Sequence, residues 1–173
     1  KKHETKFGEV RHPVHSKCFY WEGPYQEVNL PVETIYKNMR RICKTWIYPH
    51  LDIQPTKIPD DTLVIHIRSG DIFDQNVPNP EQYSPNPYHF YHTLLDSFDK
   101  AIVVTENDNY NPIVEALSYD KKVTIQRGSV AEDFSTLLGA KHVANSGVGT
   151  FAVAAALCSQ NIEHFYCTDI SIT

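Results

Sequence analysis

The sequence predicts an α/β fold in which a Rossmann-like parallel sheet, over roughly residues 62–173, follows a short and mostly helical N-terminal segment (1–61). In the second part of the chain, five apolar segments alternate with four helical ones. The apolar segments run on without alternating polar residues, which is typical of strands covered on both faces. Strands that alternate with helices in this way indicate a doubly wound α/β domain.

The composition supports a packed domain and narrows the class of ligand. Hydrophobic residues make up 41% of the 173 residues and aromatic residues 12%, which is enough to fill a core. The net charge of −5 and the absence of a basic tract argue against a nucleic-acid partner. No apolar run of about 18 residues occurs, so no transmembrane segment is predicted. The compartment stays open between the secretory pathway or Golgi lumen and the cytoplasm.

The N-terminal segment is expected to contain one helix. Residues 1–31 are polar with several prolines, and we expect irregular structure there. Residues 31–51 carry apolar side chains at helical spacing, and Pro31 suits the first turn of a helix. Residues 52–61 contain two prolines, so we interpret them as a linker to the sheet.

The elements of the second part follow one another in a regular order. A loop rich in Pro and Asn, 74–87, separates the first strand from the first helix. We expect strands at 62–68, 101–105, 122–126, 142–145 and 164–168, and helices at 88–98, 112–119, 133–140 and 150–159.

Polar residues gather where these strands end. Four strands lead into loops with the sequences "HIRSGD", "TENDN", "QRGSVAED" and "NSGVGT". In a parallel α/β sheet, ligands bind beyond the carboxyl ends of the strands. The sequence therefore predicts a ligand site at this edge of the sheet.

Arg68 ends the first strand, and Gly70 permits a close approach of the backbone to a ligand. A guanidinium group is always charged and presents a planar fork that matches phosphate oxygens. One interpretation is therefore a phosphate contact, and the other is an ion pair with Asp71 or Asp74 that shapes the loop. His66, on the same strand, is either a core histidine with one satisfied hydrogen bond or a ligand contact.

A glycine-containing loop opens the last helix directly after a strand. The free N–H groups of a helix start, together with the helix dipole, form an anion site. Ser146, Gly149 and Thr150 lie in this loop, and the alternative is a tight turn with Thr150 as the N-cap. The loop lacks the third glycine of a dinucleotide fingerprint, and no Walker sequence occurs.

Two aspartates have a structural interpretation beside a functional one, and two histidines are considered as metal ligands. Asp133, near a helix start, either caps that helix, which is the favoured interpretation, or binds a base or ribose. Asp108 is either a turn former or a ligand contact. His89 and His92 are three residues apart and could face a metal, but no carboxylate lies near them in the sequence. We predict no metal site.

Taken together, the four loops resemble those of the fucosyltransferase-like glycosyltransferases of GT-B fold, which include the α1,2-, α1,6- and protein O-fucosyltransferases. The hallmark H-x-R-R-[GT]-D of that superfamily corresponds to "HIRSGD" here, with Ser69 in place of the second arginine. "VVTENDN" resembles its T-D-D-like turn, "EDFSTLLGAKHVANS" its Asp-Phe helix and "NSGVGTFAVAAALCS" its S-x-S-T-F-like loop. These motifs cover most of residues 62–173.

The resemblance implies a function and a set of site residues. It implies transfer of a sugar to a hydroxyl of a glycan or glycoprotein, with inversion and without a metal or other cofactor. GDP-fucose is the leading donor, and another nucleotide sugar such as UDP-xylose is the alternative. Arg68 would be the catalytic residue that holds the β-phosphate. The other expected donor contacts are His66, Gly70, Asp71, Asp108, Asp133, Ser146, Gly149, Thr150 and Phe151.

GT-B enzymes have two Rossmann-like domains, so residues 1–61 are expected to be a remnant or the end of an acceptor-side domain. Two other functions stay open. One is a nucleotide-binding domain without catalysis, and the other is a different Rossmann-type enzyme, such as a dehydrogenase or methyltransferase. The position of the glycine loop after the fourth strand counts against the latter.

Overall fold

The computed structural model describes residues 3–5, 8–10, 31–73, 85–108 and 111–168, and the chain folds as two compact units, Lys1–Cys43 and Lys44–Thr173. The first unit holds two short antiparallel strands, β1 (His3–Thr5) and β2 (Gly8–Val10), and a helix, α2 (Val32–Ile42). The two strands differ from the irregular structure expected throughout residues 1–31.

The predicted N-terminal helix is present, but its geometry changes along its length. The carbonyl of Pro31 accepts hydrogen bonds from Thr34 N (2.9 Å) and Ile35 N (3.2 Å), so Pro31 is the N-cap of α2. A π-helical turn, Cys43–Ile47, and a 3-10 turn, Tyr48–His50, follow α2. None of the helices in the described ranges has the length and apolar character needed to span a bilayer.

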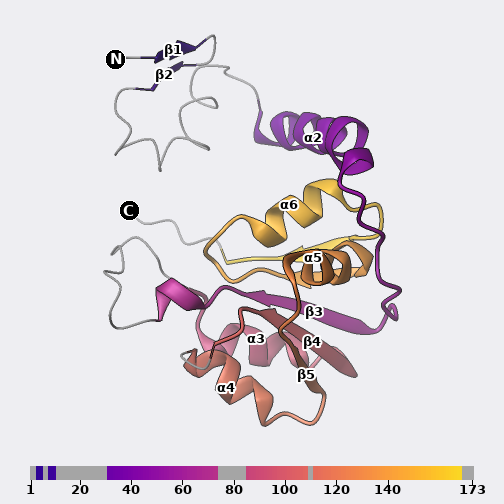
Figure 1. Cartoon of the computed structure of the whole chain (residues 1–173). Helices are drawn as coiled ribbons and strands as arrows, with labels where there is room; N and C mark the ends of the chain where they lie inside the picture. The colour runs from indigo at the N-terminus through magenta and orange to yellow at the C-terminus, as the bar shows by residue number, and fades with distance from the viewer. Residues whose placement is uncertain (1–2, 6–7, 11–30, 74–84, 109–110, 169–173) are drawn as a thin grey trace. The chain divides into compact units, whose positions relative to one another are not determined.

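The second unit is built on a parallel sheet of five strands in the order β5-β4-β3-β6-β7. The predicted parallel α/β fold is therefore confirmed. In Figure 1, helices α5 and α6 cover one face of the sheet, and α3 and α4 cover the other. The strands are β3 (Thr62–Ile67), β4 (Lys100–Thr105), β5 (Val123–Gln126), β6 (His142–Ala144) and β7 (His164–Tyr166). The helices are α3 (Tyr88–Leu95), α4 (Pro112–Ser118), α5 (Val130–Gly139) and α6 (Phe151–Cys158).

The order of the strands determines where a ligand can bind. The chain starts the sheet at the central strand β3, moves outward through β4 and β5, and then returns to add β6 on the other side of β3. The carboxyl ends of β3 and β6 therefore flank the point at which the strand order reverses. In open α/β sheets this switch point is where the crevice for a ligand forms.

The core explains why β3 is largely apolar. All six of its residues are buried. Leu63, Ile65 and Ile67 join the core between the sheet and helices α3 and α4, together with Tyr91 and Leu117. Because successive side chains of a strand point to opposite faces, the intervening positions of β3 face α5 and α6. A central strand covered on both faces is largely apolar, as the sequence pattern predicted, and Thr62 and His66 are the polar residues of β3.

Helix α5 begins earlier than expected, at Val130 and not at Asp133. Ser129 is its N-cap, and Ser129 and Glu132 form a capping box with reciprocal hydrogen bonds of 3.3 and 2.7 Å. A serine followed three residues later by glutamate is a capping pattern that can be recognised in a sequence.

Segment 52–56 is fastened along α5, and this contact generates a stability prediction. Thr56 N donates to Ser135 O at 3.0 Å, and a Cβ added to Gly139 would lie only 1.7 Å from Thr56 O. Gly139→Ala must therefore push the segment away, and we expect it to lower the free energy of unfolding by about 1–3 kcal/mol, the usual range for overpacking.

Urea unfolding of wild type and Gly139→Ala measures this difference in the free energy of unfolding. The matched control is Ser118→Ala, which also places alanine at the last residue of a helix, α4, where the side chain is exposed. Equal stabilities of the Gly139→Ala and Ser118→Ala variants would contradict the tight contact.

Candidate functional site

A cavity of about 450 Å³ lies at the carboxyl ends of β3 and β4, beside the starts of α5 and α6. This volume is within the range of about 300–1,000 Å³ that is typical of small-molecule sites. Its lining comprises His66, Arg68, Asp71, Val104, Thr105, Glu106, Asn107, Gly128, Val130, Asp133, Gly149, Thr150 and Phe151.

The cavity brings together most of the residues that the sequence predicted, from positions far apart in the chain. Seven of them line it: His66, Arg68, Asp71, Asp133, Gly149, Thr150 and Phe151. Gly70, Asp108 and Ser146 are not among the lining residues. A larger and more open groove of about 700 Å³ runs along α5 and segment 52–56, but none of the predicted site residues lines it.

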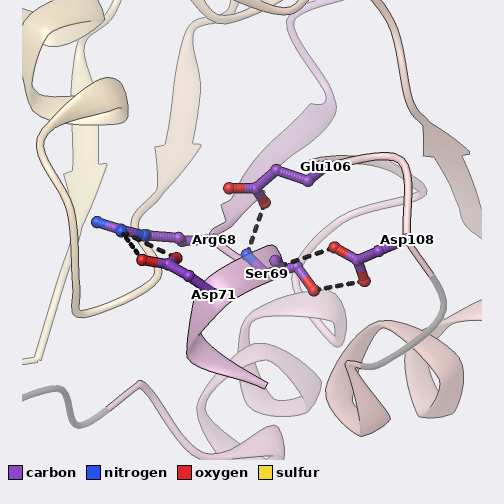
Figure 2. A network of polar contacts seen from close by, with 6 residues as sticks. Arg68, Ser69, Asp71, Glu106 and Asp108 are labelled. Carbon is purple, nitrogen blue, oxygen red and sulfur yellow. Dashed lines mark hydrogen bonds and ion pairs between the residues drawn. The ribbon is translucent and has the colours of Figure 1, made fainter. Parts of the chain in front are cut away.

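Arg68 is both a cavity residue and a partner in an ion pair. Its Nη2 donates to Asp71 Oδ1 at 3.0 Å and to Asp71 Oδ2 at 2.9 Å, so the ion pair considered in the sequence analysis is present (Figure 2). The side chains of Arg68 and Asp71 are 28% and 53% exposed. An ion pair this accessible to water contributes little to stability, about 0–1 kcal/mol, and an anionic ligand can compete for the guanidinium.

The glycine loop approaches Arg68 closely. Gly149 has a φ of +82°, and a Cβ built on it would lie 3.2 Å from Arg68 Cδ. The side chain of Arg68 therefore lies against the loop that starts α6. Thr150 is at the N-cap position of α6, but its side chain makes no capping hydrogen bond. The first-turn N–H groups of α6 thus lack a side-chain cap, and they start beside a guanidinium.

Ser146 has a structural position, unlike the phosphate contact expected of it. It is fully buried, and its hydroxyl donates to the carbonyl of Val148 within the same loop. Its N–H donates to Asn145 Oδ1 at 2.7 Å. Because a hydroxyl has a single proton, Ser146 shapes the glycine loop and has no donor left for a ligand.

His66 is buried, with 6% of its surface exposed, and its ring lies 5.3 Å from that of Phe151 between centroids. Its Nδ1 makes no hydrogen bond within the described part of the chain, and the same holds for Oγ1 of Thr105, another cavity residue. His66 is therefore a buried histidine whose Nδ1 has no hydrogen-bond partner among the described residues. Buried polar atoms without a partner are uncommon in folded proteins, and two at one cavity are consistent with a site that a ligand completes.

Asp133 is buried, with 8% of its surface exposed, and does not cap α5, so the capping interpretation is wrong. Its Oδ1 accepts hydrogen bonds from Gln126 Nε2 at 2.8 Å and from Gly128 N at 3.2 Å. No donor from the described residues reaches its Oδ2. The carboxylate is thus fixed at the cavity with one oxygen available as an acceptor.

Sequence reasoning missed Glu106, which lines the cavity and holds the loop after β3. Its Oε2 accepts a hydrogen bond from Ser69 N at 2.6 Å. Asp108 holds the same loop through Ser69 Oγ (2.8 Å) and Gly70 N (2.7 Å), so it is a loop partner of the site rather than part of its lining (Figure 2). The sequence did contain a signal for Glu106, because this residue directly follows β4, the strand that pairs with β3.

No cluster of three or more His, Cys, Asp or Glu side chains suited to a metal ion occurs in residues 3–5, 8–10, 31–73, 85–108 and 111–168. His89 and His92 are both exposed on α3.

Comparison of the chain with models of known protein families gives no match, and comparison with curated proteins gives none either.

The burial of His66 predicts a pH dependence of stability. Burial, and secondarily the charge of Arg68, lower the pKa of His66 from 6.5 to about 4. Below pH 6.5, His66 binds a proton in the unfolded chain but stays neutral in the folded chain. The free energy of unfolding is therefore unaffected by His66 above that pH, and it falls as the pH decreases toward 4. We expect His66 to account for a loss of about 2 kcal/mol between pH 7 and pH 5.

Chemical unfolding at both pH values, on wild type and His66→Gln, measures that contribution. The variant should lose about 2 kcal/mol less than wild type, whereas His92→Gln, at an exposed position of α3, should follow wild type. If His66→Gln and wild type lose equal stability, the buried neutral state of His66 is wrong.

Proposed function

We propose that this chain carries the donor-binding part of a glycosyltransferase, and that the cavity binds a nucleotide sugar, with GDP-fucose as the leading donor. The sugar is transferred to a hydroxyl of a glycan or glycoprotein. Residues 1–61 are assigned in this proposal to the acceptor side, and no metal or other cofactor is assigned. The proposal also rests on the resemblance of four loop motifs to the fucosyltransferase-like superfamily.

One observation carries the proposal: Arg68 lies against the start of α6, as the 3.2 Å between its Cδ and a Cβ at Gly149 indicates. A fixed cation and the N–H groups of a helix start are each suited to phosphate oxygens. Placed together at the strand switch point, they suit a ligand with two adjacent phosphates. A nucleotide sugar has such a diphosphate between the nucleoside and the sugar.

The chemistry of transfer makes this arrangement useful. The bond between the anomeric carbon and the diphosphate oxygen breaks, and negative charge develops on the diphosphate. The acceptor oxygen forms its bond from the opposite face, which inverts the configuration, and the hydroxyl proton is lost to a base. Donors aimed at the departing diphosphate stabilise this step, and removing one such donor typically costs about 2.7–4 kcal/mol of barrier. Arg68 would supply that stabilisation.

The three carboxylates of the lining do not oppose an anionic ligand as strongly as their number suggests. Each accepts hydrogen bonds: Asp71 from Arg68, Glu106 from the N–H of Ser69, and Asp133 from Gln126 and Gly128. Donors on a carboxylate offset part of its charge. Asp71 is the carboxylate that a bound phosphate would displace from Arg68. Its ion pair with Arg68 is exposed enough to exchange for phosphate oxygens.

Asp133 supports a guanosine donor over a uridine donor. Its Oδ2 is available at the cavity, while its Oδ1 is held by Gln126 and Gly128. Guanine presents two neighbouring N–H donors on one edge, which suits a carboxylate, whereas uracil presents one. A uridine donor such as UDP-xylose is the alternative within this proposal.

A thermal-shift panel with GDP, UDP, NAD, S-adenosylmethionine and the sugar conjugates of GDP and UDP tests the proposal. A ligand at 100 times its Kd stabilises the fold by about 2.7 kcal/mol, which gives a clear shift in Tm. We expect wild type to respond to GDP more strongly than to UDP, and Arg68→Ala to lose most of that response because the guanidinium is missing.

The matched control is Arg127→Ala, which removes an exposed arginine of the neighbouring groove and should respond as wild type does. An Arg68→Ala response equal to that of wild type would contradict the phosphate contact. A response to NAD or S-adenosylmethionine alone would favour a dehydrogenase or methyltransferase. If GDP binds but GDP-fucose and a panel of glycan acceptors give no product, the chain is a nucleotide-binding domain without catalysis.

A further inference from the structure

We propose that Glu106 and Asp108 are positioning residues, which fix the direction of the Arg68 side chain by holding the turn formed by Ser69 and Gly70. The inference rests on the proposed function insofar as Arg68 binds the phosphates. It adds two residues that act on the ligand through Arg68.

Three hydrogen bonds tie the turn to the end of β4. Ser69 N donates to Glu106 Oε2 at 2.6 Å, Ser69 Oγ to Asp108 Oδ1 at 2.8 Å, and Gly70 N to Asp108 Oδ2 at 2.7 Å. Bonds to an ionised carboxylate are shorter and stronger than bonds between neutral groups. In the view of Figure 2, Asp108 and Arg68 lie on opposite sides of Ser69. The carboxylate of Asp108 therefore binds the turn on the side that faces away from the guanidinium.

The peptide plane between Arg68 and Ser69 is held at both of its polar atoms. Its N–H donates to Glu106, and its carbonyl, that of Arg68, accepts from Asn111 Nδ2 at 3.3 Å. Asn111 is itself fixed as the N-cap of α4. Because the peptide unit is rigid, fixing this plane fixes ψ of Arg68 and thereby the direction in which its side chain leaves the strand.

The turn also brings the second contact of Arg68 into place. Gly70 has a φ of +56°, a conformation that glycine adopts without strain, and the 3-10 turn η4 (Gly70–Ile72) follows. This bend returns Asp71 toward the strand, where it accepts hydrogen bonds from Arg68 Nη2. The backbone and the guanidinium of Arg68 therefore both depend on the turn that Asp108 and Glu106 hold.

The inference also accounts for Ser69, which stands where the resemblance leads one to expect an arginine. Ser69 is fully buried, and its hydroxyl satisfies Asp108. A serine at this position supplies two donors, its N–H and its hydroxyl, to two carboxylates of the next strand end. Glu106 and Asp108 therefore both have Ser69 as a hydrogen-bond partner.

A double-mutant cycle tests the coupling to Arg68. We would measure the Kd of GDP by calorimetry for wild type, Asp108→Asn, Arg68→Ala and the double variant. Asp108→Asn should weaken GDP binding about tenfold in wild type, in line with the loss of hydrogen bonds to a charged group, and less than about twofold in the Arg68→Ala background. Equal weakening in both backgrounds would overturn the inference, because Asp108 would then act independently of Arg68.

The matched control is Asp120→Asn, which removes a carboxylate that accepts a hydrogen bond from Lys122 N at 2.9 Å in the turn before β5. This variant should bind GDP as wild type does. The control shows whether losing any turn carboxylate weakens binding through general destabilisation.

A second measurement decides the inference without a nucleotide, so that it can fail separately from the proposed function. Relaxation of the Arg68 Nε resonance reports how well the side chain is ordered. Asp108→Asn should lower that order, together with faster hydrogen exchange at the Ser69 and Gly70 amides, while Asp120→Asn should not. If wild type fails to bind GDP, the proposed function fails. If the order of Arg68 is unchanged in Asp108→Asn, the positioning role fails.

Discussion

The contact between the Arg68 side chain and the loop that starts α6 is the constraint on which the account depends. It arises because β6 adds to the sheet beside β3, so that their carboxyl ends open side by side. Gly149 makes the contact sterically feasible, since a side chain there would meet Arg68. A cation at one strand end and a helix start at the next then line a single cavity, and the diphosphate site proposed here needs both.

The surroundings of Arg68 balance two opposing requirements. The guanidinium needs enough exposure to meet a ligand, and it needs a fixed direction. Asp71 is an exposed partner of Arg68, and the partly buried hydrogen bonds of Ser69 with Asp108 and Glu106 hold the backbone that follows Arg68. His66 is buried, and burial lowers its pKa to about 4, so its ring is neutral at pH 7.

The sequence was sufficient for the parallel α/β fold of the second unit, because its apolar segments alternate regularly with helical ones, but it did not predict β1 and β2. It also identified Arg68 and Gly149, since a guanidinium and a glycine at strand ends are each unusual enough to notice. It could not reveal what Ser146 and Asp108 do, because their partners are set by the three-dimensional path of the loops. The contact of Ser69 Oγ with Asp108 spans 39 residues. Only the structure shows that Ser146 shapes its own loop while Asp108 holds another.

The most direct test of the proposal that Arg68 and the start of α6 bind one diphosphate is chemical-shift mapping by NMR, with GDP compared with guanosine. Addition of GDP should shift the backbone amides of Gly149, Thr150 and Phe151 together with the Arg68 Nε resonance, all with the same Kd. Guanosine, which lacks phosphates, should leave these resonances in place and affect those near Asp133. If GDP shifts the Arg68 resonance but not the amides at the start of α6, or shifts neither, then the two elements do not bind a common diphosphate.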